Sequence, residues 1–296
     1  MHATSSQGPN KASELIRLKG VLRGAGLSIP PFSLLLPDCR DEQITRAIAR
    51  FSRLYRPEGP FEDYAIIRNN GRPTGTGKGE SKIIPLWYTS QDRKTRYPGQ
   101  EPLIPLIRNK ISYVLASDPE AQGVLFQAYA GQTFLAENNS SGYFAPLVSG
   151  IAYTSSCTKR GNAVVEWAYG CPSVVVKGRG RYVAFNVDTL ESEVGKMDLG
   201  VGDNIEVAGV RGPREPSLWE IRRVISFFQG LGDEMKRSLF TGLFRSILEL
   251  GKSGPLYLEW ALTNINSKTR LFALQAAEFE RMLAGCRRRC FTSWGS

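Results

Sequence analysis

The sequence predicts an α+β protein, because helical and strand-like segments follow one another in an uneven order along the chain. Hydrophobic residues make up 42% and charged residues 22% of the 296 residues, which is typical of a globular protein with a packed core. The length favours two domains or one large one. A chain of this size can bury about three quarters of the surface that its unfolded form exposes.

Helical spacing and glycine positions define the elements of the first third of the chain. Leu15, Leu18 and Leu22 lie on one stripe at helical spacing, and Gly24 and Gly26 end that helix. The predicted elements are a helix at residues 11–27, a strand at 32–36, a helix at 41–55, a strand at 64–68, a glycine-rich loop at 69–81 and a helix at 101–116.

Short runs of β-branched and aromatic residues predict mainly strands in the rest of the chain. Residues 131–143 are polar and irregular, and residues 188–214 are charged and rich in turns. The predicted elements are strands at 124–129, 150–154, 163–168, 173–177 and 182–186, helices at about 216–230 and 232–251, a hairpin of strands at 256–261 and 271–275 joined by a polar turn at 264–268, and a last helix at about 276–286.

The single histidine, His2, excludes several classes of catalytic site. It lies in a polar N-terminal stretch, whereas Ser-His-Asp and Cys-His sites need a positioned imidazole. Zinc sites built from cysteine and histidine are disfavoured for the same reason. A phosphohistidine carrier within this chain is not expected either.

The cysteines and the N-terminus predict a reduced, cytoplasmic protein. The five cysteines are an odd number without a Cys-x-x-Cys pair, and the N-terminus lacks an apolar signal sequence. No apolar run is long enough to cross a bilayer, so we expect no membrane partner.

The net charge of +10 favours a phosphate-bearing partner without choosing among nucleotides, nucleic acids and membrane surfaces. Part of the excess lies in the last residues, where Arg287, Arg288 and Arg289 form a solvated basic end. Nucleic-acid binding is disfavoured because no recognised nucleic-acid motif accompanies the charge.

The glycine-rich stretch from Gly75 to Ser81 is not a P-loop. Arg72 stands where a P-loop has its first glycine, and Gly79 follows Lys78 where serine or threonine is needed for the metal. A glycine-rich loop after a strand can still cradle phosphates with its backbone N–H groups. The alternative is an ordinary surface loop.

Two N-terminal segments place cations at the ends of elements. Gly8-Pro-Asn-Lys11-Ala-Ser-Glu-Leu15, followed by Ala25-Gly-Leu-Ser-Ile-Pro-Pro31, puts Lys11 at a helix N-terminus, where an ammonium adds to the backbone donors for phosphate. Arg68 ends the apolar strand Ala65-Ile-Ile-Arg68, and its planar guanidinium matches phosphate oxygens. For Lys11 the alternative is a solvated surface lysine.

Further segments carry polar residues on apolar strands. Two polar groups that face one way from a hairpin of apolar strands are costly unless they bind something. Glu259 and Gln275 offer the hard oxygen atoms that Mg²⁺ prefers, although strand alternation also permits a pair of surface-facing residues. The segments are Val124-Leu-Phe-Gln127, Val148-Ser-Gly-Ile-Ala-Tyr-Thr154, Ala163-Val-Val-Glu166-Trp-Ala-Tyr-Gly170, Leu256-Tyr-Leu-Glu259-Trp-Ala261 and Leu271-Phe-Ala-Leu-Gln275-Ala-Ala277.

In this order, over about residues 8–276, the segments resemble the ATP-binding domain of the phosphoenolpyruvate synthase, pyruvate phosphate dikinase and rifampin phosphotransferase family. The resemblance implies an ATP-grasp fold, with the nucleotide site between two subdomains. We expect the subdomains at residues 1–115 and 116–285, followed by a basic tail at 286–296.

The resemblance also implies a role for each matching residue. Lys11 and Arg68 are expected to contact the ATP phosphates and to take part in catalysis, and Glu259 and Gln275 to hold Mg²⁺. The other residues expected to bind the nucleotide are Gln127 near the adenine, Glu166, and Gly75 and Gly77 in a loop that covers the phosphates.

Three departures from the family pattern fall on polar positions. Ala277 replaces the family arginine that follows Gln-x, Ser173 replaces a family glutamate, and Asn69-Asn70 replaces a Ser-Ser pair. The arginine normally neutralises charge on the transferring phosphoryl group, and losing such a contact can cost several kcal/mol of transition-state stabilisation.

The resemblance implies an ATP-dependent phosphotransferase that moves a phosphoryl group from Mg-ATP to an acceptor on a partner protein or a small molecule. Because this chain holds no suitable histidine and ends soon after the ATP-binding domain, we expect a separate acceptor protein of the phosphohistidine type. Direct transfer to a small molecule and carboxylate activation by a ligase are the other routes. The alternative is a degenerate, non-catalytic module that binds a nucleotide or a partner, which the departures favour.

Overall fold

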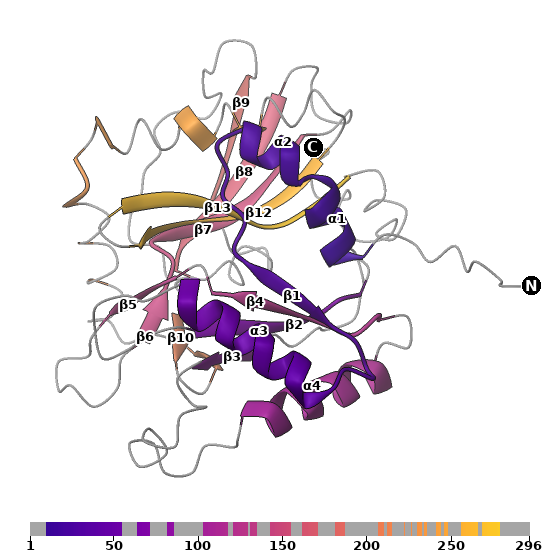
Figure 1. Cartoon of the computed structure of the whole chain (residues 1–296). Coiled ribbons are helices and arrows are strands. Elements are labelled where there is room, and N and C mark those ends of the chain that lie inside the picture. The colour runs from indigo at the N-terminus through magenta and orange to yellow at the C-terminus, as the bar shows by residue number, and fades with distance from the viewer. Residues whose placement is uncertain are drawn as a thin grey trace, which may run out of the picture.

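A computed structural model places the helices and strands of the chain in the arrangement of Figure 1. The described residues are 10–54, 64–71, 82–85, 103–117, 121–129, 131–134, 143–154, 162–170, 181–186, 207–209, 212–214, 256–265 and 268–278, with short pieces at 222, 226, 230–232, 234–235, 241–243 and 246–247.

The first sheet has four antiparallel strands in the order β1-β4-β2-β3. Because side chains alternate along a strand, Ile67 and Phe126 share one face, and there they join a buried cluster with residues of two helices. Arg68 and Leu125, which pair across β2 and β4, share the opposite face. The elements are β1 (Phe32–Leu35), β2 (Tyr64–Asn69), β3 (Lys82–Pro85), β4 (Val124–Ala128) and the covering helices α3 (Asp41–Leu54) and α4 (Leu103–Ser117).

The second sheet has five antiparallel strands in the order β13-β12-β7-β8-β9 and lies above the first in Figure 1. Its strands are β7 (Val148–Thr154), β8 (Asn162–Tyr169), β9 (Arg181–Asn186), β12 (Leu256–Ile265) and β13 (Lys268–Glu278). A small third sheet has the order β11-β10-β6-β5, formed by β5 (Gln132–Phe134), β6 (Tyr143–Ala145), β10 (Val207–Gly209) and β11 (Gly212–Arg214).

One face of the five-stranded sheet is apolar and carries the larger core. Trp260 and Trp167 lie on it with Gly150 between them in register, and both indoles are buried. A Cβ at Gly150 would collide with the backbone of Glu166, so the close approach of β7 and β8 requires glycine there. Leucines of α1 (Lys11–Arg17) and α2 (Lys19–Gly24) belong to the same core.

The segment after α2 joins the two sheets. Ser28 pairs with the edge of β13, since its N–H donates to the Leu271 carbonyl at 2.9 Å and its carbonyl accepts from the Ala273 N–H at 2.8 Å. The chain then enters β1 of the other sheet. Further back, the N-terminus of α1 is fixed by a capping box, in which Asn10 and Ser13 satisfy each other's backbone N–H groups.

The observed elements confirm the predicted α+β class, with differences at several segments. Residues 132–134, 207–209 and 212–214 form strands where irregular or turn-rich chain was expected. Residues 276–278 continue β13 instead of starting a helix, because small alanines at 276 and 277 pair with β12 and pack in the sheet. The predicted strand at 173–177 lies outside the described residues.

The proposed division of the chain stays a prediction, and the sheet pairing bears on it in one respect. β4 comes after residue 115, the expected end of the first subdomain. It nevertheless pairs with β1 and β2, which come before that residue, so the first sheet draws on both sides of the expected boundary.

Among the described helices, none is long and apolar enough to span a membrane.

Candidate functional site

A β-bulge on the edge strand brings Glu259 and Gln275 together. The two residues are paired in register, but the next pair along is Trp260 with Ala273, so Leu274 is the extra residue. Without this insertion, Gln275 would pair with Leu258 and point into the apolar core. The bulge therefore turns the Gln275 side chain onto the same face as Glu259, opposite to the tryptophans.

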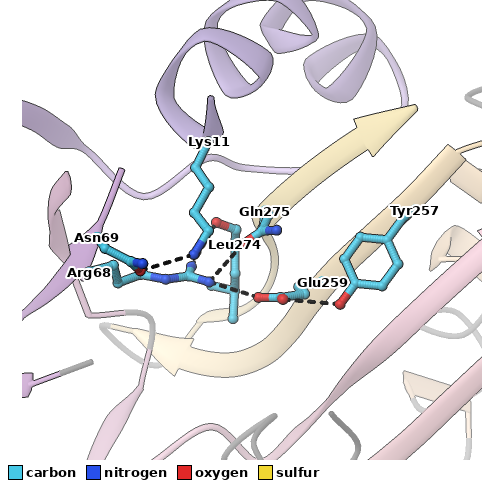
Figure 2. Close-up of polar contacts among 7 residues, drawn as sticks. All are labelled: Lys11, Arg68, Asn69, Tyr257, Glu259, Leu274 and Gln275. Carbon is cyan, nitrogen blue, oxygen red and sulfur yellow. Dashed lines mark hydrogen bonds and ion pairs between the residues drawn. The ribbon is translucent and has the colours of Figure 1, made fainter. Parts of the chain in front are cut away.

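Arg68 reaches this pair from the other sheet, as Figure 2 shows. Its Nη2 donates to Glu259 Oε2 at 3.0 Å and to Gln275 Oε1 at 2.9 Å. Its Nη1 donates to the Leu274 carbonyl oxygen at 3.2 Å. Three oxygen atoms of different kinds, a carboxylate, an amide and a backbone carbonyl, thus converge on one guanidinium.

The Arg68–Glu259 ion pair is largely shielded from water, with side chains 14% and 11% exposed. An ion pair in such surroundings gives up much of its hydration, and it is stable only when further hydrogen bonds satisfy both partners. Arg68 has Gln275 and Leu274 as further partners, and Glu259 accepts a second hydrogen bond from Tyr257 at 3.0 Å. The cluster is accordingly well satisfied as it stands.

Lys11, at the start of α1, lies beside the same cluster in Figure 2. Its Nζ donates to Asn69 Oδ1 at 3.3 Å, and Asn69 directly follows Arg68. The neighbouring Asn70 accepts from the Ala12 N–H at 2.9 Å. The Asn69-Asn70 pair, which departs from the expected Ser-Ser, therefore holds the first turn of α1 against the end of β2.

Glu166 lies on the same face of the five-stranded sheet, two strands away from Glu259, with Ile151 between them in register. Burial raises the pKa of the Glu166 carboxyl above its ordinary value, while a hydrogen bond from the Tyr153 hydroxyl at 3.3 Å partly opposes the rise. The structure thus places Glu166 on the site face but outside the Arg68 cluster.

Tyr257 is a polar residue of this face that the sequence reasoning did not single out. Burial and then the neighbouring Glu259 carboxylate raise the pKa of its phenol well above the ordinary value of 10.0. The only signal in the sequence is spacing, because residues two apart on a strand face the same way. Ala277, which stands where the resemblance led us to expect an arginine, pairs with Tyr257 and is also buried.

Gln127 lies on β4, on the sheet face that carries Arg68. It pairs with Ile66, two residues before Arg68, and is 1% exposed. Its Nε2 has no hydrogen-bond partner within the described chain, which is unusual for a buried amide. The loop glycines Gly75 and Gly77 lie outside the described residues, as does Ser173.

The oxygen atoms around Arg68 suit a hard divalent cation. The Glu259 carboxylate, the Gln275 amide oxygen and the Leu274 carbonyl are of the kinds that bind Mg²⁺. No group of three or more Asp, Glu, His or Cys side chains gathers anywhere in the ranges the structure describes. Mg²⁺ bound here would thus take its remaining ligands from water or phosphate, as it does beside nucleotides.

Comparison with known proteins gives structural likenesses only. No protein-family model matches the chain, and no curated protein sequence matches it either. D-alanine–D-alanine ligase from Helicobacter pylori is similar at 9% identity and a TM-score of 0.31, over 95% of this chain. The ADP complex of purK, N5-carboxyaminoimidazole ribonucleotide synthetase, is similar at 13% identity and a TM-score of 0.33, over 92% of this chain.

This chain spans 60% of the length of the first of these proteins and 45% of the second. Likenesses at such scores do not decide the fold, so the α+β class rests on the chain's own sheets and helices.

Proposed function

We propose that the chain is an ATP-grasp-type domain that binds Mg-ATP between its two larger sheets and transfers a phosphoryl group to an acceptor. The observation that carries this proposal is the cluster in which Arg68 of the first sheet meets Glu259 and Gln275 of the second. It combines a phosphate-binding cation with oxygen ligands for a divalent metal at one place.

Phosphate and metal can enter this cluster by exchange of partners. A triphosphate offers Arg68 oxygen atoms that match its planar guanidinium. Once Arg68 turns to the phosphates, Glu259 Oε2 and the Gln275 amide oxygen, which now accept hydrogen bonds from it, would hold a Mg²⁺ ion that neutralises phosphate charge. Lys11, which now bonds to Asn69 beside Arg68, supplies the second cation for phosphate.

The buried amide of Gln127 supports a nucleotide rather than a bare phosphate as the ligand. Its Nε2 is a donor without a described partner and lies on the same sheet face as Arg68. A base with ring nitrogen acceptors would satisfy it. This is the placement that the resemblance implies for the adenine.

The type of phosphoryl acceptor is inferred from the histidine content of the chain. A separate protein of the phosphohistidine type fits best, since the only histidine of this chain is His2. Transfer to a small molecule, or activation of a carboxylate as in ligases, would use the same Mg-ATP cluster. The acceptor therefore distinguishes these reactions, whereas the nucleotide site does not.

One observation favours a second candidate function, a module that binds nucleotide without turning it over. Ala277 puts a methyl group on the site face beside Tyr257, where the family pattern has an arginine. A site without that cation stabilises the charge of the transition state less than a site that has it, whereas ground-state binding keeps its other contacts. Such a protein would bind Mg-ATP and release neither ADP nor AMP.

Calorimetric titration with ATP, with and without Mg²⁺, tests the nucleotide site. We expect Arg68→Ala and Lys11→Ala to weaken binding, because each removes a cation from the phosphate site. Arg108→Ala is the matched control, since Arg108 pairs with Asp41 on the helices that cover the far face of the first sheet. Equal affinity in all four proteins would refute the assignment, and Mg²⁺-dependent ATP turnover, measured as ADP or AMP formation, would separate the phosphotransferase from the binding module.

A further inference from the structure

The Glu259 carboxylate is held from two sides by groups of different kinds. Arg68 donates to Oε2 at 3.0 Å, and the Tyr257 hydroxyl donates to Oε1 at 3.0 Å. Figure 2 shows the two donors on opposite sides of the carboxylate. Tyr257 and Glu259 are two residues apart on β12, so their side chains emerge from the same face of one rigid strand.

Only one of these two contacts can be exchanged for a ligand. Arg68 is a cation that phosphate oxygens can draw away, whereas Tyr257 is a neutral hydroxyl, 8% exposed as a residue, with Glu259 as its acceptor. Its register partner on β13 is the small residue Ala277. When Arg68 turns away, Oε2 is released while Oε1 stays fixed.

We propose that Tyr257 is a positioning residue that holds the Glu259 carboxylate by Oε1, so that Oε2 faces a divalent cation beside Gln275. This inference rests on the proposed Mg-ATP site. The hydroxyl itself touches neither the cation nor the nucleotide. It fixes the rotamer of the ligand, in the way that hydrogen-bond partners behind a metal ligand generally do.

The sheet contains a close internal control. Tyr153 pairs with Tyr257 in register on the neighbouring strand β7, and its hydroxyl bonds to a different carboxylate, that of Glu166. Replacing either tyrosine by phenylalanine removes one hydroxyl from the same sheet face and keeps the ring. Of the two hydrogen bonds described for these hydroxyls, the one that Tyr257→Phe removes is the one to Glu259.

The test measures Mn²⁺ binding by electron paramagnetic resonance in the presence of saturating ADP, for the full chain and each variant. We expect Tyr257→Phe to weaken Mn²⁺ binding by about tenfold or more, the usual effect of removing a partner of a metal ligand. ADP affinity in the presence of a chelator should not change. Tyr153→Phe should bind Mn²⁺ like the unmodified chain.

A double variant shows whether the effect passes through Glu259. In a Glu259→Gln background, Tyr257→Phe should cause no further loss of Mn²⁺ affinity. Three results would overturn the role of Tyr257 while leaving the proposed Mg-ATP site in place. They are full Mn²⁺ affinity in Tyr257→Phe, an equal loss in Tyr153→Phe, and an undiminished loss in the double variant. If the unmodified chain binds neither ADP nor Mn²⁺, the proposed function fails, and this role fails with it.

Discussion

Replacing Arg68 by alanine should destabilise the fold as well as the ligand site. The side chain makes three hydrogen bonds from the first sheet to the second, and its loss leaves the Glu259 carboxylate buried without a cation. Removing one partner of a buried ion pair costs about 3–5 kcal/mol. Because the two side chains retain 14% and 11% exposure, we expect the lower end, about 3 kcal/mol.

Urea unfolding followed by tryptophan fluorescence measures this loss, since Trp167 and Trp260 lie in the core beneath the site face. Adding Glu259→Gln to Arg68→Ala removes the stranded charge, so the double variant should recover about 1 kcal/mol or more relative to the sum of the single changes. Arg108→Ala, at an exposed pair, should leave the midpoint unchanged. A loss below about 1 kcal/mol for Arg68→Ala, or strict additivity, would refute the reasoning.

Three further predictions concern the five-stranded sheet. Gly150→Ala should unfold at a markedly lower temperature, because its Cβ would meet the Glu166 backbone, and an unchanged melting temperature would show that β7 and β8 are not this close. Glu166→Gln should stabilise the chain more at pH 7 than at pH 4 in urea titrations. Because the folded pKa of Glu166 lies above its ordinary value of 4.5, the folded state binds more protons between the two values and loses stability as pH rises through them; a pH-independent difference would contradict this. Glu259→Gln should lower Mg²⁺-dependent ADP formation more than metal-free ATP binding, and equal losses would show that Glu259 is not a metal ligand.

The parts of the site that follow strand periodicity could be predicted from the sequence. Arg68 ends an apolar strand and Glu259 interrupts another, and both positions are conspicuous because a charged group on a buried strand needs a partner. Their mutual contact depends on how two sheets meet, and the resemblance implied only that both residues serve one ATP site. The structure adds the hydrogen bonds that join them.

The bulge at Leu274 could not be predicted, because nothing in Leu271-Phe-Ala-Leu-Gln275 distinguishes a regular strand from one with an inserted residue. It decides which way Gln275 points. The role of Asn70 was also hidden, since the group that donates to its side-chain oxygen, the Ala12 N–H, is distant in sequence. Tyr257 appeared as an ordinary aromatic strand residue, and its hydrogen bond to Glu259 depends on side-chain rotamers that a sequence pattern does not encode.

Thermal unfolding with and without excess Mg-ATP tests the central claim most directly. A ligand at about 100 times its dissociation constant adds roughly 2.7 kcal/mol to the native state. We predict a clear rise in the melting temperature of the full chain with Mg-ATP, and a smaller rise in Arg68→Ala. No shift at millimolar Mg-ATP would contradict the nucleotide site and leave the Arg68 cluster as a structural ion pair between two sheets.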